Sequence, residues 1–212
     1  MKLKVCGMKY PNNIQEVASL EIDYMGFIFY PKSKRYVGED IELSVIKAIP
    51  SRIKPVAVFV NESKERIIEL AKKYNFNILQ LHGNESPDFV SDMSSLGFII
   101  IKAFAIDTKF NFELTRKYET YTDYFLFDTK SDSYGGTGES FDWNLLSKYH
   151  QETPFFLSGG LSIDNISSIK NFNELNIHAL DLNSKFESEP GLKKIDLIKK
   201  AIQDINNLDT KS

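Results

Sequence analysis

The stretch "NILQLHGNESPDFVSDMSSLGFIIIKA" (residues 77–103) contains two short apolar segments with a polar segment between them. Residues 77–82 and 98–103 are short and rich in aliphatic and β-branched side chains, which predicts two strands, and the residues between them predict a helix over 86–95. The run 98–101 is entirely apolar, as in a strand buried on both faces. A strand, a helix and another buried strand in this order are typical of a parallel sheet covered by helices.

The same alternation recurs along the whole chain. Further strands are predicted at 3–6, 24–29, 54–60, 124–128, 154–158 and 177–182, and further helices at 11–19, 41–49, 63–74, 111–118, 141–148, 162–170 and 192–202. Ser63 or Asn61 is expected to cap the helix over 63–74. The pattern favours the α/β class and a single (β/α)8 TIM barrel with eight parallel strands, with residues 1–212 as one domain. An open doubly wound sheet fits less well.

Composition narrows the class of protein. The chain has 212 residues, of which 42% are hydrophobic and 26% are charged, and its net charge is −3, as in an ordinary globular protein. Lysines and arginines are scattered, so we do not expect a nucleic acid partner. A single cysteine allows no intramolecular disulfide, and no apolar run approaches the roughly 20 residues that cross a bilayer. We therefore expect a cytoplasmic protein with no membrane partner.

Unusual polar residues fall where the predicted strands end. In a barrel of this kind the active site lies at the carboxyl ends of the strands and in the loops that follow them. The residues expected at this rim are Cys6, Arg35, His82, Asp128, Gly159, Gly160, Asp181, Asn183 and Ser184.

The segment "SGGLSIDN" (158–165) predicts a phosphate site. The glycines let backbone N–H groups approach an anion, and a helix capped by Ser162 would add partial positive charge. Ser184 could open a short extra helix directed at the same phosphate. A plain tight turn at Gly159 and Gly160 is the alternative.

Asp128 follows four apolar residues, and burial at such a strand mouth favours the protonated carboxyl that a general acid needs. Its alternative role is to cap the following loop. That loop, "TKSDSYGGTGESFDW" (129–143), contains three glycines and is expected to act as a mobile lid.

Three more rim residues have two possible roles each. Cys6 could be an inert buried thiol, as most lone cysteines are, or a reactive thiolate if a neighbour such as Lys4 lowers its pKa. Arg35 could lie on the surface or hold a carboxylate. His82 could act in proton transfer or be a satisfied histidine at a strand end.

Six ordered segments resemble the phosphoribosylanthranilate isomerase family of tryptophan biosynthesis. They are "KVCGMK" (4–9), "GFIFYPKSKRYV" (26–37), "VAVFVNES" (56–63), "LQLHG" (79–83), "FDTKSDSYGGTGESFDW" (127–143) and "FFLSGGL" (155–161). They span nearly the whole chain in the family's order.

The resemblance implies a (β/α)8 barrel that catalyses an Amadori rearrangement. N-(5-phosphoribosyl)anthranilate would become 1-(2-carboxyphenylamino)-1-deoxyribulose 5-phosphate by acid–base catalysis, without a metal or an organic cofactor. Cys6 is the implied general base and Asp128 the implied general acid. Arg35 is expected to hold the anthranilate portion, and the phosphate is expected at Gly159, Gly160 and the end of the eighth strand.

One position departs from the family pattern, because Lys185 stands where a glycine is common. This puts the phosphate ligands near it in doubt and leaves the catalytic pair unaffected. The expected partner is a small phosphorylated substrate, and the mixed charges on the outer helices fit a monomer or a homodimer.

Rival functions remain open from the sequence. A metal-dependent pentulose-phosphate epimerase would need a cluster of histidines and aspartates at the rim. An indole-glycerol-phosphate synthase would need lysines there, and Lys4 and Lys102 lie inside strands. A catalytically silent barrel that binds a phosphorylated metabolite or a protein is the remaining alternative.

Overall fold

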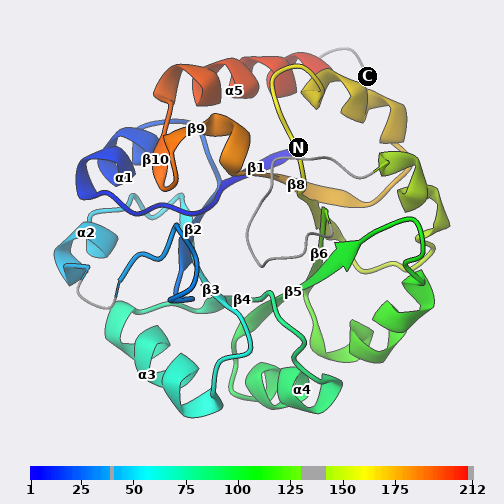
Figure 1. Cartoon of the computed structure of the whole chain (residues 1–212), viewed down its shortest axis with the longest axis horizontal. Helices are drawn as coiled ribbons and strands as arrows, with labels where there is room; N and C mark the ends of the chain where they lie inside the picture. Colours follow the sequence, from blue (N-terminus) through cyan, green and yellow to red (C-terminus); the bar gives the residue numbers. More distant parts are fainter. Residues whose placement is uncertain (39–40, 130–141, 210–212) are drawn as a thin grey trace.

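Eight parallel strands close into a barrel, and each pairs with the next until β8 pairs with β1 (Figure 1). The computed structural model describes residues 1–38, 41–129 and 142–209. The barrel strands are β1 (Lys2–Val5), β2 (Tyr24–Ile28), β3 (Lys54–Phe59), β4 (Ile78–Leu81), β5 (Ile99–Ile106), β6 (Tyr124–Thr129), β7 (Phe155–Leu157) and β8 (Ile177–Leu182). All eight predicted strands are confirmed.

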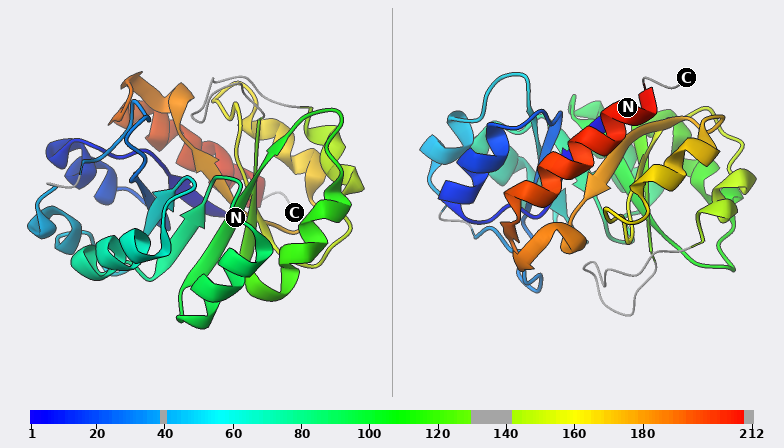
Figure 2. Two further views of the ribbon diagram at one scale, coloured as in Figure 1. Left: turned by 60° about the horizontal axis from the view of Figure 1, so that its bottom comes forward. Right: turned by 90° about the horizontal axis from the view of Figure 1, so that it is seen from above.

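A ring of helices surrounds the strands (Figures 1 and 2). Five are α-helices: α1 (Pro11–Ala18), α2 (Leu43–Lys47), α3 (Lys64–Tyr74), α4 (Pro87–Ser95) and α5 (Ile195–Asp209). Three connections are 3₁₀-helices instead of the expected α-helices: η1 (Phe112–Tyr121), η2 (Trp143–Lys148) and η3 (Ile166–Phe172).

One predicted helix cap is confirmed and another is wrong. Ser63 caps α3, where its side chain accepts a hydrogen bond from the Arg66 amide. Ser162 caps no helix, because its amide donates to Asn165 Oδ1 and η3 begins only at Ile166.

The chain after β8 was expected to be helical from residue 192. It forms the short helix η4 (Ser184–Phe186) and a hairpin of β9 (Glu187–Glu189) and β10 (Leu192–Lys193), before α5 begins. Gly191 has a φ of 94° in the hairpin turn, a conformation that lets the chain reverse there.

Alternate side chains of the strands build two separate cores. One alternate set points into the barrel, and its buried members include Tyr24, Val56, Ile101, Leu126 and Phe156. The other set packs against the helices in a larger core. Each fully buried aliphatic or aromatic side chain contributes about 1.5–3 kcal/mol to folding, so both cores stabilise the closed sheet.

Aromatic residues close the amino-terminal end of the barrel. The hydroxyl of Tyr24 lies 2.8 Å from His178 Nε2, and the ring centroid of Tyr124 lies 4.3 Å from that of His178. All three residues lie at or near the first position of their strands. Burial, with help from Lys2 and Lys54, lowers the pKa of His178 from 6.5 to about 4. His178 is therefore a neutral part of the barrel floor.

We expect stability to fall as the pH drops from about 6.5 to about 4 because of His178. In this window the unfolded chain binds a proton at this histidine while the folded protein does not, so protonation favours unfolding. Because the ring is partly exposed, the loss should be on the order of 1 kcal/mol. Urea unfolding at both ends of the window measures it in the wild type and in His178→Gln, which retains polar contact with Tyr24. An unchanged pH dependence in the variant would contradict this role.

Candidate functional site

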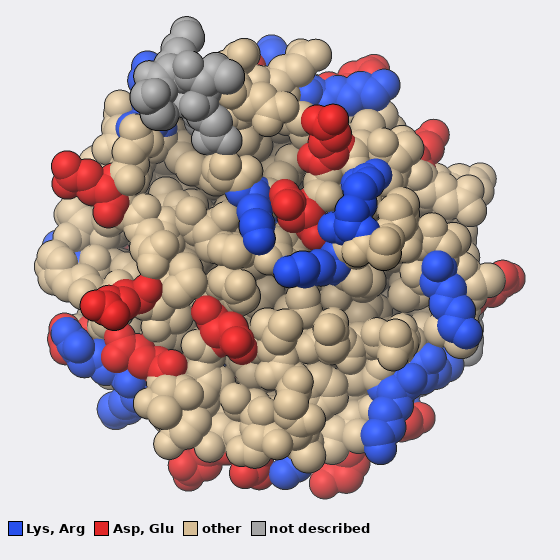
Figure 3. Space-filling view, turned by 180° about the vertical axis from the view of Figure 1, so that it is seen from behind, with Lys and Arg blue, Asp and Glu red and all other residues tan. Residues whose placement is uncertain are grey.

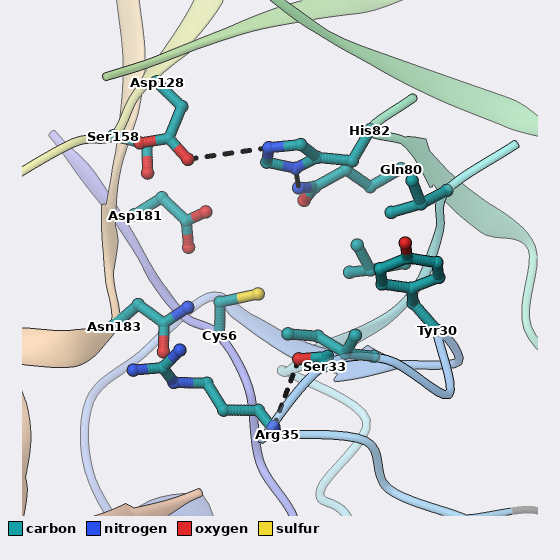
Figure 4. Close-up of a pocket in the computed structure, with 13 residues that line it drawn as sticks. Cys6, Tyr30, Ser33, Arg35, Gln80, His82, Asp128, Ser158, Asp181 and Asn183 are labelled. Atoms are coloured by element: carbon teal, nitrogen blue, oxygen red, sulfur yellow. Dashed lines mark hydrogen bonds and ion pairs between the residues drawn. The ribbon is translucent and has the colours of Figure 1, made fainter. Parts of the chain in front are cut away.

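A cavity opens at the carboxyl end of the barrel, and its empty space, counted together with its open mouth, is about 500 Å³ (Figure 4). The lining comes from strand ends and from the loops that follow them: Cys6, Ile28, Tyr30, Ser33, Arg35, Val58, Val60, Gln80, His82, Asp128, Ser158, Asp181 and Asn183.

Most of the expected rim residues meet in this cavity. Six of the nine line it, namely Cys6, Arg35, His82, Asp128, Asp181 and Asn183. Gly159, Gly160 and Ser184 are not part of the lining, although Ser158, beside Gly159, is. Most of the expected lid over 129–143, namely residues 130–141, lies outside the described residues.

Cys6 is 3% exposed and ends the inner face of β1. Gly26 on β2 leaves room for it, because a Cβ at Gly26 would lie 2.6 Å from the Cys6 sulfur. Burial raises the pKa of the Cys6 thiol, and Lys4 and Lys193 offset only part of this effect while Asp181 adds to it. Of the two alternatives for Cys6, a thiolate whose pKa Lys4 alone lowers is therefore not found in the free site. Cys6 is a thiol there at neutral pH.

Lys4 lies below Cys6, fully buried inside the barrel. Its Nζ donates to Gln80 Oε1 at 2.8 Å and to Asp181 Oδ2 at 2.9 Å. Burial lowers the pKa of Lys4, but the charge of Asp181 and its hydrogen bond, with a further contribution from Cys6, outweigh this effect and raise the pKa above the ordinary value. The lysine is thus a fixed positive charge beneath the cavity.

The second oxygen of Asp181 is buried and has no hydrogen-bond partner among the described residues. A buried acceptor without a partner costs roughly 1–3 kcal/mol, so a ligand hydroxyl that donates to Oδ1 would recover this cost. Asp181 therefore combines a structural contact to Lys4 with a free acceptor on a residue that lines the cavity.

Asp128 and His82 face each other across the cavity mouth. Asp128 Oδ2 lies 3.5 Å from His82 Nε2, and Asp128 Oδ1 accepts a 2.8 Å hydrogen bond from the Thr129 amide. The side chains are 19% and 27% exposed, so both groups can reach a ligand. Among the described residues, the hydrogen bond from the Thr129 amide is the local contact that fits the capping alternative for Asp128.

Arg35 is held by a carboxylate that the sequence did not single out. Its Nε lies 3.0 and 2.9 Å from the two oxygens of Glu187, and its Nη2 lies 2.8 Å from Glu187 Oε2. Lys193 also contacts Glu187 and donates to Asn183 Oδ1 at 2.8 Å. Burial raises the pKa of Glu187, but the hydrogen bonds from Arg35 and Lys193 hold it below its ordinary value.

This cluster of two cations and one anion carries a net positive charge at the cavity edge. Burial lowers the pKa of Lys193 to about 8, so it remains largely protonated at neutral pH. Lys193 thereby neutralises Glu187, and the charge of Arg35 stays available to a ligand. The exposed-surface alternative for Arg35 is wrong, since this residue is 8% exposed.

The turn after β7 has the conformation that glycine allows. Gly159 and Gly160 have φ values of 84° and 68°, and a Cβ at Gly159 would lie 2.3 Å from Thr129 Oγ1. The Asn165 side chain fixes the turn by donating to the Gly160 carbonyl. Lys185 lies within η4, and it is not among the described residues with positive φ, so this position does not need a glycine.

Sequence reasoning missed Gln80, Glu187, Lys193 and Tyr30. Gln80 could have been found, because it precedes His82 by two positions on β4 and so shares its face of the sheet. Lys4 and Cys6 have the same relation on β1. No local pattern marks Glu187 or Lys193, and the hairpin that contains them was not predicted, since a helix was expected from residue 192. Lys102 turns outward from the barrel to a buried ion pair with Glu85 at 2.8 Å, and it does not line the cavity.

The chain matches known proteins over nearly its full length. The family model described as N-(5'phosphoribosyl)anthranilate (PRA) isomerase matches residues 3–204. The N-(5'-phosphoribosyl)anthranilate isomerase of Parabacteroides distasonis is 50% identical over 206 residues, which cover 97% of this chain and 93% of that protein. The enzyme of the same name from Phocaeicola vulgatus is 41% identical over 193 residues, covering 91% of this chain and 92% of that protein.

Solved structures agree with these matches. The phosphoribosyl anthranilate isomerase of Thermotoga maritima superimposes with a TM-score of 0.85 at 31% identity, covering 98% of this chain and 99% of that one. Another phosphoribosyl anthranilate isomerase, solved with reduced 1-(o-carboxyphenylamino)-1-deoxyribulose 5-phosphate, has a TM-score of 0.82 at 28% identity and covers 98% and 99% of the two chains.

Proposed function

The chain belongs to the N-(5'-phosphoribosyl)anthranilate isomerase family, and from this premise we propose that Cys6 and Asp128 are its catalytic base and acid. The enzyme converts N-(5'-phosphoribosyl)anthranilate to 1-(2-carboxyphenylamino)-1-deoxyribulose 5-phosphate in tryptophan biosynthesis. The observation that carries the assignment is that β1 and β6 bring one thiol and one carboxyl to the same cavity.

Asp128 starts the reaction as an acid. Its proton passes to the furanose ring oxygen, the bond from C1 to that oxygen breaks, and the lone pair of the anilino nitrogen forms a C=N bond. The product of this step is an open-chain iminium cation. Without the proton the ring oxygen would leave as an alkoxide, which is why a positioned acid accelerates the step.

Cys6 completes the rearrangement as a base. The iminium acidifies the C2 hydrogen, and the thiolate removes it while the C–H electrons form an enolamine; C1 then gains a proton and the C2 hydroxyl loses one, which leaves the ketone. Burial keeps Cys6 protonated in the free site, but a positive iminium beside it favours loss of the thiol proton to solvent and so the charged thiolate. The base is therefore activated by the intermediate on which it acts.

The remaining residues of the cavity hold the two ends of the substrate. We assign the anthranilate carboxylate to Arg35 and its ring to the apolar wall of Ile28, Val58 and Val60. We assign the ribose hydroxyls to Asp181 Oδ1, which accepts hydrogen bonds from them, with Asn183 and His82 nearby. We assign the phosphate to Gly159, Gly160 and Ser184. The paired left-handed glycines favour this binding, because successive amides in such a turn can point at one anion.

Replacing Arg35 with methionine should raise KM about 10-fold to 100-fold, because one charged hydrogen-bonding partner contributes roughly 1.5–3 kcal/mol. The fall in kcat should be smaller, since Arg35 does not touch the reacting carbons. Steady-state kinetics measure both constants. Lys34→Met is the matched control, because Lys34 is an exposed cation next in the chain and should leave KM unchanged. Equal effects of the two substitutions would contradict the assignment of Arg35.

The fluorescence of freshly prepared phosphoribosylanthranilate tests the function directly. The anthranilate-type emission should fall as the rearranged product forms, at a rate proportional to enzyme concentration. A rate equal to the spontaneous breakdown of the substrate would overturn the assignment.

We also infer a cytoplasmic location, because Cys6 can act as a base only while it remains reduced. None of the helices in the described part of the chain is long and apolar enough to cross a membrane. On the face in Figure 3 acidic and basic side chains are intermixed, which supports the expectation of no nucleic acid partner.

A structure from Thermotoga maritima concerns monomers generated from a dimeric relative. For this chain both monomer and homodimer remain predictions, as does the single domain over 1–212.

A further inference from the structure

Gln80 lies between Lys4 and His82 and contacts both, and Figure 4 shows it beside His82. Its Oε1 accepts from Lys4 Nζ at 2.8 Å, and its Nε2 lies 2.7 Å from His82 Nδ1. Gln80 and Lys4 are 1% and 0% exposed, so water does not compete for these contacts. The three residues form a continuous chain from beneath Cys6 to the side of Asp128.

The donors and acceptors along this chain admit one arrangement. A lysine ammonium donates and cannot accept, so the Gln80 oxygen must face Lys4. The Gln80 amide nitrogen must then face His82, and because it donates, Nδ1 of His82 must carry its lone pair. The proton of the imidazole is consequently on Nε2, the atom 3.5 Å from Asp128 Oδ2.

We propose that Lys4 and Gln80 are positioning residues that hold His82 as its Nε2–H tautomer, so that the acidic proton of Asp128 can pass only to the substrate. This inference rests on the proposed role of Asp128 as the acid. In the opposite tautomer Nε2 would present a lone pair to Asp128 and could take its proton. With Nε2 already protonated, His82 donates toward Asp128 and stabilises the carboxylate left after proton transfer.

The surroundings of Asp128 and His82 agree with this role. Asp128 faces His82 and receives the Thr129 amide, and Asp181 is the other charged group of the barrel interior that interacts with both. Asp181 is held by Lys4, the same ammonium that orients Gln80. Lys4 therefore holds the Asp181 carboxylate in place and, through Gln80, also fixes the tautomer of His82.

Nitrogen-15 NMR of the labelled full-length protein tests the tautomer without any turnover. The chain has three histidines, and the signals of His82 are those that disappear in His82→Asn. We expect Nδ1 of His82 to resonate as an unprotonated nitrogen and Nε2 as a protonated one at neutral pH. A protonated Nδ1 in the wild type would overturn the inference.

Two substitutions at Gln80 test whether this residue fixes the tautomer of His82. In Gln80→Glu both oxygens can only accept, so Nδ1 of His82 should become protonated. In Gln80→Met, Nδ1 loses its partner, and kcat should fall about 10-fold to 100-fold with little change in KM, a size typical of losing a histidine's orienting partner. A wild-type His82 spectrum and a wild-type kcat in both variants would contradict the role of Gln80. If Gln80→Met does not fold, the spectrum of Gln80→Glu decides.

Gln151→Met is the matched control. Gln151 is also a buried glutamine, but it contacts Thr115 and the Phe112 carbonyl outside the barrel interior. This substitution should lower stability and leave both kcat and the His82 signals unchanged. The tautomer is read without substrate, so an active Asp128→Asn would refute the acid assignment separately from the arrangement at Gln80.

Discussion

Asp128→Asn should lower kcat by about 10²- to 10⁴-fold, the range that a positioned general acid contributes. The amide has the size of the carboxyl, and its oxygen can still accept the hydrogen bond that the Thr129 amide gives to Asp128 Oδ1. It has no acidic proton for the ring oxygen, so opening of the furanose should become the slow step. The fluorescence assay gives kcat and KM, and we expect KM to change far less than kcat.

Asp92→Asn is the control for removing one carboxyl. Asp92 is exposed on α4 and pairs with Lys64 at 2.9 Å, an exposed ion pair that contributes at most about 1 kcal/mol. This variant should retain the wild-type kcat. If Asp128→Asn unfolds at a much lower temperature than Asp92→Asn and recovers its activity when cooled, the carboxyl is structural and the acid assignment fails.

Cys6→Ser should reduce kcat by a similar factor, about 10²- to 10⁴-fold, for a different reason. Serine fits the space that Gly26 leaves on the neighbouring strand, so the cavity should keep its shape. An alcohol is a far weaker acid than a thiol, however, and the iminium cannot convert it to the anionic base. Proton removal from C2 should then limit the rate.

Binding of the reduced product separates chemistry from folding in Cys6→Ser. Reduced 1-(o-carboxyphenylamino)-1-deoxyribulose 5-phosphate was bound in a related structure, and calorimetry with this compound should give nearly equal affinities for the variant and the wild type. A kcat within twofold of the wild type would support the inert buried thiol instead. Deuterium at C2 of the substrate should also slow the variant, because the C–H bond breaks in its slowest step.

Much of the fold followed from local patterns. The apolar runs at 98–101 and 154–157 are typical of strands buried on both faces. Segments with helical spacing lie between successive strands. This alternation predicted the order of the strands and favoured a closed barrel. The 3₁₀ form of η1 to η3 was not predictable, because its hydrogen-bonding pattern differs from that of an α-helix by one residue while the apolar spacing is similar. The hairpin at Glu187–Glu189 and Leu192–Lys193 was missed because its two strands are too short to show alternation.

The sequence by itself determined which residues reach the rim. Strand residues alternate between two faces, so a strand that ends in Cys6 also directs Lys4 into the barrel, and one that ends in His82 directs Gln80 there. Parallel order then places Asp128, Asp181 and Asn183 at the same end as Cys6.

Only the tertiary structure decided which of these groups touch and what their contacts do. Closure of the barrel pairs Lys4 with Asp181, 177 positions away, and with Gln80, 76 positions away, and it brings Glu187 to Arg35 across 152 positions. The pKa of Cys6 depends on the balance between burial and these cations, and burial outweighs the opposite effect of Lys4. The physical reason is that alternation sets the direction of a side chain locally, whereas desolvation and charge pairing depend on every neighbour that closure brings within a few ångströms.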